Sequence, residues 1–362
     1  MNPYFPEMQK NFGFGMMRLP MLGEDVDIPQ VKAMVDAFLV AGFNYFDTAR
    51  PYIKGKSELV IRECISRRYP RDKFLLANKL SGSCFETEKD ILPFFESQLE
   101  ACGVDYFDFY LCHAVSKKMD AHLSQANAYE VLRQLKEQGK IRHLGFSFHD
   151  SAEFLDDFLT RHPELEFAQI QFNYADYEDP RVQSRKCYEV CRKHGKPVFI
   201  MEPVKGGSLV NLPREALALM DGSPASYAIR YAAGFPGVAM VLSGMSDMAQ
   251  VADNLSFMTN FQPLSGAEQE VLSRVLPLYQ ARHKIPCTGC NYCVDGCPAG
   301  IPIPKVFALL NQKRAEEGQP EAEYEALSVR ADACVGCGSC EAECPQHLQI
   351  RKLLTEVTKA FN

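Results

Sequence analysis

The sequence has 362 residues, of which 46% are hydrophobic and 23% charged, and its formal net charge is −7. This composition excludes wholesale disorder, and the negative charge provides no basic field that would attract nucleic acid or acidic lipid. The sequence has no run of 18 apolar residues, and its N-terminus lacks the pattern of a signal peptide. We therefore expect a soluble, cytoplasmic protein that binds neither nucleic acid nor a membrane.

Apolar and β-branched runs alternate with segments of helical periodicity along most of the chain. The predicted strands are residues 12–17, 43–47, 74–79, 106–112, 141–147, 167–172, 197–201 and 238–242. Helices are predicted at residues 29–41, 56–68, 88–102, 127–138, 151–161, 181–194, 213–232 and 247–258. Eight strands that are each followed by a helix, within about 250 residues, are typical of a (β/α)8 TIM barrel. A doubly wound open sheet is the alternative, but no G-x-G-x-x-G motif opens the first predicted helix to support it.

Four side chains capable of acid–base chemistry follow three successive predicted strands. Asp47 ends the second predicted strand and Tyr52 comes shortly after it, while Lys79 ends the third strand and His113 directly follows the fourth. Each residue alone has a structural explanation, because an aspartate can cap a helix, a lysine can be solvated and a histidine can belong to the core. The carboxyl ends of barrel strands are where such folds build their active sites, so the joint appearance of the four predicts a catalytic site.

The 14 cysteines fall into two sets. Six are scattered and are interpreted as small buried hydrophobes, namely Cys64, Cys84, Cys102, Cys112, Cys187 and Cys191. Eight form two copies of the pattern C-x2-C-x2-C-x3-C-P, which are Cys287, Cys290, Cys293 and Cys297 and then Cys334, Cys337, Cys340 and Cys344. The second copy begins 47 residues after the first, so the pattern is an internal repeat in a separate C-terminal domain.

The spacing of the repeat cysteines suits two [4Fe-4S] clusters. Three thiolates at this spacing can each reach one iron of a cubane, and in two-cluster ferredoxins the fourth cysteine of each run binds the other cluster. One cluster is therefore assigned to Cys287, Cys290, Cys293 and Cys344, and the other to Cys334, Cys337, Cys340 and Cys297. A pair of zinc sites and a disulfide framework are the alternatives, although zinc ribbons use separate C-x2-C pairs. The repeat resembles the bacterial dicluster ferredoxin pattern over about residues 285–350.

Segments around the predicted catalytic residues resemble those of the aldo-keto reductase family. They are FDTARPY at residues 46–52, NKL at residues 78–80 and YLCHA at residues 110–114. GFGMMRLP at residues 13–20 and LGFSFHD at residues 144–150 resemble that family's first-strand and fifth-strand segments. The resemblance covers about residues 10–258. Together with the cysteine repeat, it makes the chain similar to a ferredoxin-fused aldo-keto reductase.

The resemblance implies an oxidoreductase that reduces a small-molecule carbonyl or conjugated carbonyl substrate. Tyr52 would donate a proton to the carbonyl oxygen, and the Lys79 cation would favour the phenolate of a side chain whose ordinary pKa is about 10. Asp47 would hold Lys79 charged and in place. His113 would hydrogen-bond the carbonyl oxygen.

A nicotinamide cofactor is also implied, with altered contacts around its ring. Ser147 and Gln169 match the family's ligands of the nicotinamide amide, whereas Phe148 replaces an expected asparagine. Met201 falls where an aromatic ring would stack on the nicotinamide. The ring contacts are therefore only partly those of the family.

The phosphate side of the cofactor site departs further from the family pattern. The relevant positions fall at Ser243, Gly244, Gln250, Asp253 and Asn254, of which the last two match the adenine-side pair. Because Gly244 and Gln250 replace the basic residues that clamp the 2′-phosphate, selectivity for NADPH over NADH is predicted to be weak. Lys205 is a partial substitute for that clamp.

The role of the clusters stays open, because hydride transfer moves two electrons together and a [4Fe-4S] cluster normally moves one. A flavin can bridge the two kinds of transfer. The clusters are structural, or they supply FMN bound at the barrel mouth in place of nicotinamide, or they exchange electrons with a ferredoxin-like or flavoprotein partner. They favour a reducing, anaerobic cytoplasm. The alternative function is an iron–sulfur electron-transfer protein whose barrel is a docking scaffold without carbonyl reductase activity.

The predicted domains are the barrel at residues 1–262, a helical linker at residues 263–286 and the dicluster domain at residues 287–362. Ser265 and Glu268 form the pattern of a capping box at the start of the linker helix. Further helices are predicted at residues 303–311 and 347–361. The acidic stretch at residues 316–325 is interpreted as a solvated loop or face.

Overall fold

The computed structural model describes residues 2–282 and 284–361, which form two compact units. The barrel unit covers residues up to Asp179 together with Gln183–Pro203 and Ala225–Ser265. The C-terminal unit covers Pro180–Val182, Val204–Pro224 and the residues from Gly266 onward, so it takes in a segment that follows a barrel strand. The longest helices of the described chain have 15 residues, and none of them has the length and apolar character needed to span a bilayer.

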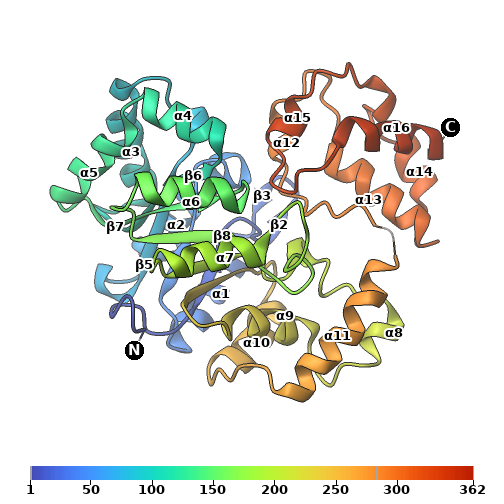
Figure 1. Cartoon of the computed structure of the whole chain (residues 1–362), viewed down its shortest axis with the longest axis horizontal. Helices are drawn as coiled ribbons and strands as arrows, with labels where there is room; N and C mark the ends of the chain where they lie inside the picture. Colours follow the sequence, from blue (N-terminus) through green and yellow to red (C-terminus); the bar gives the residue numbers. More distant parts are fainter. Residues whose placement is uncertain (1, 283, 362) are drawn as a thin grey trace. The chain divides into compact units, whose positions relative to one another are not determined.

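Eight parallel strands close into a barrel (Figure 1). Their bounds are β1 (Phe12–Gly15), β4 (Tyr45–Asp47), β5 (Leu75–Leu80), β6 (Phe107–Val115), β7 (Ile141–Phe148), β8 (Phe167–Gln171), β9 (Val198–Met201) and β10 (Val238–Gly244). The barrel closes because β1 pairs with both β4 and β10. A short antiparallel hairpin follows β1 and consists of β2 (Met21–Leu22) and β3 (Asp25–Val26). The predicted (β/α)8 barrel is confirmed with all eight strands, and the open-sheet alternative is wrong.

Helices follow the strands around the barrel (Figure 1). Their bounds are α1 (Ile28–Val40), α2 (Lys56–Ile61), α3 (Glu88–Cys102), α4 (Lys117–Gln125), α5 (Ala128–Glu137), α6 (Ala152–Arg161), α7 (Ser184–Lys193), α9 (Pro224–Ala233) and α10 (Met248–Met258). A π-helical turn, Arg62–Ser66, continues α2. The predicted elements lack α4, because its polar sequence KKMDAHLSQ has little apolar periodicity.

The single helix predicted at residues 213–232 is wrong. The structure has two helices there, α8 (Arg214–Leu217) and α9, separated by a turn. Gly222 in that turn has a φ of 115°, which favours glycine, and Pro224 begins the second helix. The helical periodicity of the sequence runs across this turn and conceals it.

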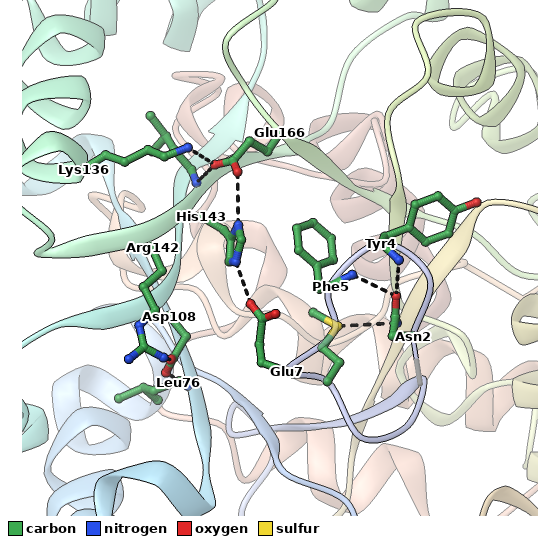
Figure 2. A network of polar contacts seen from close by, with 12 residues as sticks. Asn2, Tyr4, Phe5, Glu7, Leu76, Asp108, Lys136, Arg142, His143 and Glu166 are labelled. Atoms are coloured by element: carbon green, nitrogen blue, oxygen red, sulfur yellow. Dashed lines mark hydrogen bonds and ion pairs between the residues drawn. The ribbon is translucent and has the colours of Figure 1, made fainter.

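The N-terminal segment lies across the amino ends of the barrel strands (Figure 2). The ring of Phe5 meets the rings of Phe109 and Phe199 edge to face, with centroids 5.2 and 5.7 Å apart. Asn2 Nδ2 donates a hydrogen bond of 2.7 Å to the carbonyl oxygen of Ala239, near the start of β10. An apolar core therefore fills this end of the barrel, which leaves the carboxyl ends of the strands for polar chemistry.

His143 joins the N-terminal segment to the barrel wall (Figure 2). Its Nε2 lies 2.6 Å from Oε1 of Glu7, and its Nδ1 lies 3.1 Å from Oε2 of Glu166. Burial works to lower the pKa of His143, but the carboxylates of Glu166 and Glu7 outweigh it and raise the pKa above its ordinary value. The folded protein therefore binds this proton more tightly than the unfolded chain.

We expect the ion pairs of His143 to stabilise the fold fully below a pH of about 6.5, the ordinary pKa of histidine, and to lose this effect as the pH rises through the raised folded-state pKa. The measurement compares urea unfolding midpoints of the wild type and His143→Asn from mildly acidic to alkaline pH. The wild type should exceed the variant most at acidic pH. A difference that stays constant or grows with rising pH would contradict this assignment.

The C-terminal unit is built from short helices around its own core. Beside α8, they are α11 (Gly266–Gln280), α12 (Tyr292–Asp295), α13 (Ile303–Arg314), α14 (Pro320–Glu325), α15 (Ser339–Ala342) and α16 (Ile350–Phe361). Phe307 and Leu310 of α13 belong to one buried cluster with Leu354 of α16. Ala216 of α8 and Val275 of α11 form a second, smaller cluster. The helices predicted at residues 303–311 and 347–361 are confirmed, and α11 lies within the predicted linker.

The acidic stretch at residues 316–325 includes α14, which was predicted only as a loop or face. The carboxylates of the helix are exposed, as predicted for a solvated face. Glu321 and Glu323 form ion pairs with Lys313 and Lys305 of α13, at 3.0 and 2.5 Å. Tyr324 points the other way and stacks on Phe361 with ring centroids 4.2 Å apart. The two buried residues of α14, Pro320 and Tyr324, are four positions apart, which is the spacing of one face of a helix.

Candidate active site

The carboxyl ends of β4 and β5 form a buried ion pair. Asp47 is the last residue of β4, and Lys79 lies near the end of β5. Lys79 Nζ lies 2.6 Å from Asp47 Oδ1 and donates a second hydrogen bond of 2.8 Å to the carbonyl oxygen of Thr48. The Lys79 side chain is fully buried, so these two oxygens fix its position.

Burial raises the pKa of Asp47 and lowers the pKa of Lys79, and the ion pair between them opposes both shifts. Each group therefore keeps the other charged in a place where a single charge would be unfavourable. Removing one partner of such a buried pair costs about 3–5 kcal/mol of folding free energy. Asp47 thus holds the Lys79 ammonium in one position and in its charged form.

Tyr52 lies in the turn after β4, with its ring facing Lys79. Lys79 Nζ lies 4.9 Å from the centroid of that ring. The rings of Tyr52 and His113 meet edge to face with centroids 6.2 Å apart. Directly after Tyr52 the backbone is left-handed at Ile53 and Lys54, each with a φ of 52°. Non-glycine residues in this region cost about 1–3 kcal/mol each, and such strain persists where the surroundings fix the backbone.

A bulge in β6 sets the direction of His113. The pairing of β6 with β7 shifts register between Cys112 and Val115, and Ala114 has a left-handed φ of 54°. Bulges of this kind turn a side chain away from the regular alternation of the strand. His113 Nδ1 then lies 2.7 Å from Oγ of Ser81, a site residue that no sequence pattern predicts.

The His113 ring is held neutral at neutral pH. Burial first, and then the positive charges of Lys79 and His149, hold the pKa of His113 well below its ordinary value. A neutral imidazole has one N–H donor. When the Ser81 hydroxyl donates to Nδ1, that proton is on Nε2.

The distances among Asp47, Lys79, Tyr52 and His113 show that the four predicted catalytic residues lie together at one end of the barrel.

The predicted contacts of the nicotinamide ring lie on β7, β8 and β9. Ser147 Oγ accepts a hydrogen bond of 2.7 Å from Ala114 N and keeps its own proton to donate. Gln169 Oε1 is buried and, within the described residues, accepts no hydrogen bond, while Gln169 Nε2 lies 3.8 Å from Met201 Sδ. A buried acceptor without a donor costs about 1–3 kcal/mol, which an amide N–H of a ligand would remove. These residues fit the carboxamide of a nicotinamide.

The predicted phosphate-side residues lie at the end of β10 and on α10. Asn254 Nδ2 donates a hydrogen bond of 3.0 Å to Ser243 Oγ, and the neighbouring Asp253 is half-buried. A Cβ at Gly244 would lie 3.2 Å from the side chain of Arg18. A basic residue that the sequence patterns do not predict for the phosphate side therefore lies beside this glycine. The position of Arg18 could have been predicted from barrel closure, because β1 pairs with β10 and Arg18 follows β1.

The eight repeat cysteines surround two cavities of the C-terminal unit. One cavity is lined by Cys287, Cys290, Cys293 and Cys344. The other is lined by Cys297, Cys334, Cys337 and Cys340. Each cavity takes three cysteines from one copy of the pattern and the fourth from the other copy. All eight thiols are free of disulfides, and among the described residues no three potential ligands converge tightly enough for a single metal ion.

Corresponding residues of the two copies share the same unusual backbone. Gly289 and Gly336, each placed before the second cysteine of its run, have φ values of 69° and 73°. Asn291 and Gly338, each placed after that cysteine, have φ values of 67° and 83°. Glycine and asparagine are the residues that adopt such values most readily. The left-handed turns wind the chain around each cavity, which explains the small residues between the cysteines.

The loop after β9 packs against the first cysteine run. Lys205 is buried with a φ of 49°, and its Nζ lies 3.4 Å from Oε1 of Gln346, which lines the cavity of Cys287. A Cβ at Gly206 would lie 2.4 Å from the carbonyl oxygen of Thr288, so only glycine fits this approach. The ammonium of Lys205, expected to replace part of a phosphate clamp, is thus directed at the wall of a cysteine cavity.

The scattered cysteines pack as apolar side chains. Cys64, Cys102, Cys112, Cys187 and Cys191 are buried, and Cys84 is half-buried. Burial raises the pKa of Cys64 to about 11 and that of Cys187 to about 12. Thiols with such values are not reactive at neutral pH.

Known protein families match both the barrel and the cysteine-repeat region of the chain. The sequence profile of the aldo/keto reductase family matches residues 11–222, and that of the 4Fe-4S dicluster domain matches residues 286–348. An aldo-keto reductase of Mycolicibacterium vanbaalenii is 28% identical over 245 residues, which are 66% of this chain and 82% of the relative. The NADH-specific methylglyoxal reductase of Escherichia coli is 27% identical over 195 residues, 48% of this chain and 57% of the relative.

Solved structures support the barrel fold. The aldo-keto reductase from Klebsiella pneumoniae in complex with NADPH superposes with a TM-score of 0.60 and 21% identity, covering 74% of this chain and 91% of that structure. The family profile spans more than half of the chain and ends beyond β9. The protein therefore belongs to the aldo/keto reductase family of oxidoreductases, and its sequence continues after the barrel into a 4Fe-4S dicluster domain.

Proposed function

We propose that the barrel unit reduces a carbonyl group, with Tyr52 as the proton donor. The position of the Lys79 ammonium supports this proposal most directly. It lies 2.6 Å from the Asp47 carboxylate and 4.9 Å from the centre of the Tyr52 ring. As Tyr52 gives its proton to the carbonyl oxygen, this buried charge stabilises the phenolate that develops. The neutral His113 ring donates a hydrogen bond to the same oxygen and orients the carbonyl.

A nicotinamide nucleotide, when bound, supplies the hydride. Gln169 Oε1 and the Ser147 hydroxyl would hold its carboxamide, and Arg18 would lie on the phosphate side, beside Gly244. The buried acceptor of Gln169 is satisfied by a carboxamide N–H, so this position fits a nicotinamide. The NADPH in the Klebsiella structure and the NADH specificity of the Escherichia coli relative support the same class of cofactor.

Anaerobic assays with iron-replete protein test the proposal. They follow the absorbance of NADH and of NADPH with a panel of aldehydes and ketones, methylglyoxal included. Oxidation of either nucleotide that depends on a carbonyl compound is the expected result. If no carbonyl is reduced with either nucleotide, the barrel is a scaffold and the alternative electron-transfer function is favoured.

We further propose that the two cysteine cavities hold two [4Fe-4S] clusters, the first on Cys287, Cys290, Cys293 and Cys344, and the second on Cys297, Cys334, Cys337 and Cys340. The crossed origin of the four thiols in each cavity supports this grouping. Thiolates bind iron, so cluster assembly displaces protons from these thiols. The half-buried and exposed positions of several of the cysteines leave room for electron exchange with a partner.

Lys205 should set the potential of the first cluster. A nearby positive charge stabilises the reduced cluster, which carries one more negative charge, and so raises its reduction potential. We expect Lys205→Met to shift one of the two midpoint potentials to a more negative value in an EPR-monitored redox titration. Lys205→Arg keeps the charge and should retain the potential. An equal shift of both clusters, or no shift at full iron content, would contradict this role.

A further inference from the structure

A further cavity of the C-terminal unit, the cationic cleft, has a volume of about 390 Å³. It is defined by five basic residues, Arg181, Lys284, Arg314, His347 and Lys352. Ile285, Leu348 and Leu353 supply apolar surface between them. Nothing in the carbonyl reduction proposed for the barrel uses these residues.

The side chains that line the cleft are mostly basic, whereas the chain as a whole has a net charge of −7. Among the described residues that line the cleft, Glu356 is the sole carboxylate, and it already accepts a hydrogen bond of 3.0 Å from Arg314. Burial, and then the neighbouring Arg282, lower the pKa of Lys284, and Glu317 opposes this shift. Cations held together in this way repel one another, and a bound anion relieves the repulsion.

The cleft shares a wall with the first cysteine cavity. Leu348 lines both the cleft and the cavity of Cys287, Cys290, Cys293 and Cys344. Ile285 is two residues before Cys287, and His347 is three residues after Cys344. A molecule bound in the cleft would therefore be separated from the proposed first cluster by a single layer of side chains.

We propose that the cationic cleft binds an aromatic molecule that carries a phosphate group, of the size and charge of flavin mononucleotide. The volume of the cleft is within the range of about 300–1,000 Å³ that small-molecule sites occupy. The apolar surface suits an aromatic ring system, and guanidinium and ammonium groups are the natural partners of a phosphate. A flavin exchanges electrons singly with iron–sulfur clusters and in pairs with hydride donors, which is the conversion that this fusion of domains requires.

Anaerobic equilibrium dialysis of the cluster-loaded protein tests the proposal, with FMN, riboflavin and inorganic phosphate as probes. FMN should bind to the wild type, riboflavin at least tenfold more weakly because it lacks the phosphate, and inorganic phosphate should compete with FMN. Lys284→Ala combined with Lys352→Ala should weaken FMN binding at least tenfold. Lys359→Ala is the matched control, because Lys359 is an exposed lysine on the same helix, α16, that does not line the cleft.

Two results would overturn the proposal. One is the absence of FMN binding to protein with full iron content, and the other is equal binding by the double variant and the wild type. Equal affinity for FMN and riboflavin would likewise exclude the phosphate contacts. Because the readout is binding and not turnover, none of these results depends on whether the barrel reduces a carbonyl.

Discussion

Replacing Tyr52 by phenylalanine is expected to lower kcat/KM for carbonyl reduction by about 10³-fold, within the range that a positioned general acid contributes. The substitution removes the hydroxyl that gives its proton to the carbonyl oxygen and leaves the Asp47–Lys79 ion pair in place. The iron content and the cluster absorbance should not change, since the cysteine cavities belong to the other unit. The measurement is steady-state oxidation of the reduced nucleotide by a carbonyl compound.

Tyr45→Phe is the matched control for this variant. Tyr45 lies on β4, before the turn that holds Tyr52, and it is fully buried; within the described residues its hydroxyl makes no hydrogen bond. Removing that hydroxyl should leave kcat/KM unchanged and the fold equally stable or more stable. Activity of Tyr52→Phe close to that of the wild type, or an equal loss in both variants, would contradict the role of Tyr52.

Double substitutions of the repeat cysteines should separate the crossed grouping from a grouping within each run. Cys293→Ser with Cys344→Ser removes two ligands of one proposed cluster, so the protein should keep about four of about eight irons. Cys340→Ser with Cys344→Ser removes one ligand from each cluster and should bring the iron count well below four. Both variants lose two thiols, so each is the control for the other.

The grouping within each run gives the opposite result. In that arrangement Cys340 and Cys344 would serve one cluster, and their double variant would keep about four irons. Iron and sulfide analysis of anaerobically purified protein, together with the EPR spectrum of the reduced state, distinguishes the two. An excess of zinc over iron in the wild type would exclude both cluster assignments.

The sequence predicts the strands of the barrel well because their patterns are local. Each strand is a short apolar run, and Asp47, Lys79 and His113 stand at or next to the carboxyl ends of three such runs, so their convergence follows from the parallel sheet alone. The two cysteine runs are also local patterns, whereas the crossed grouping between them comes from the similarity to two-cluster ferredoxins.

Local sequence patterns do not predict the contacts that form when the barrel closes or that loops make. Arg18 comes beside Gly244 only because the first strand pairs with the last. Lys205 follows a barrel strand in sequence, yet it lies in the C-terminal unit beside Gln346, through a left-handed turn that no periodicity marks. Ser81 contacts His113 because a bulge redirects the histidine, and bulges leave little trace in a pattern of two-residue period.

We expect the hydride that reduces the carbonyl to come from a nicotinamide bound in the barrel. This expectation is tested by a single turnover with reduced nicotinamide nucleotide that carries deuterium at both C4 positions, followed by mass spectrometry of the alcohol product. The arrangement of Tyr52, Lys79, His113 and Gln169 predicts one deuterium on the former carbonyl carbon. A product without deuterium would contradict this claim, because its hydrogen would then have come from solvent, with the electrons supplied by another route.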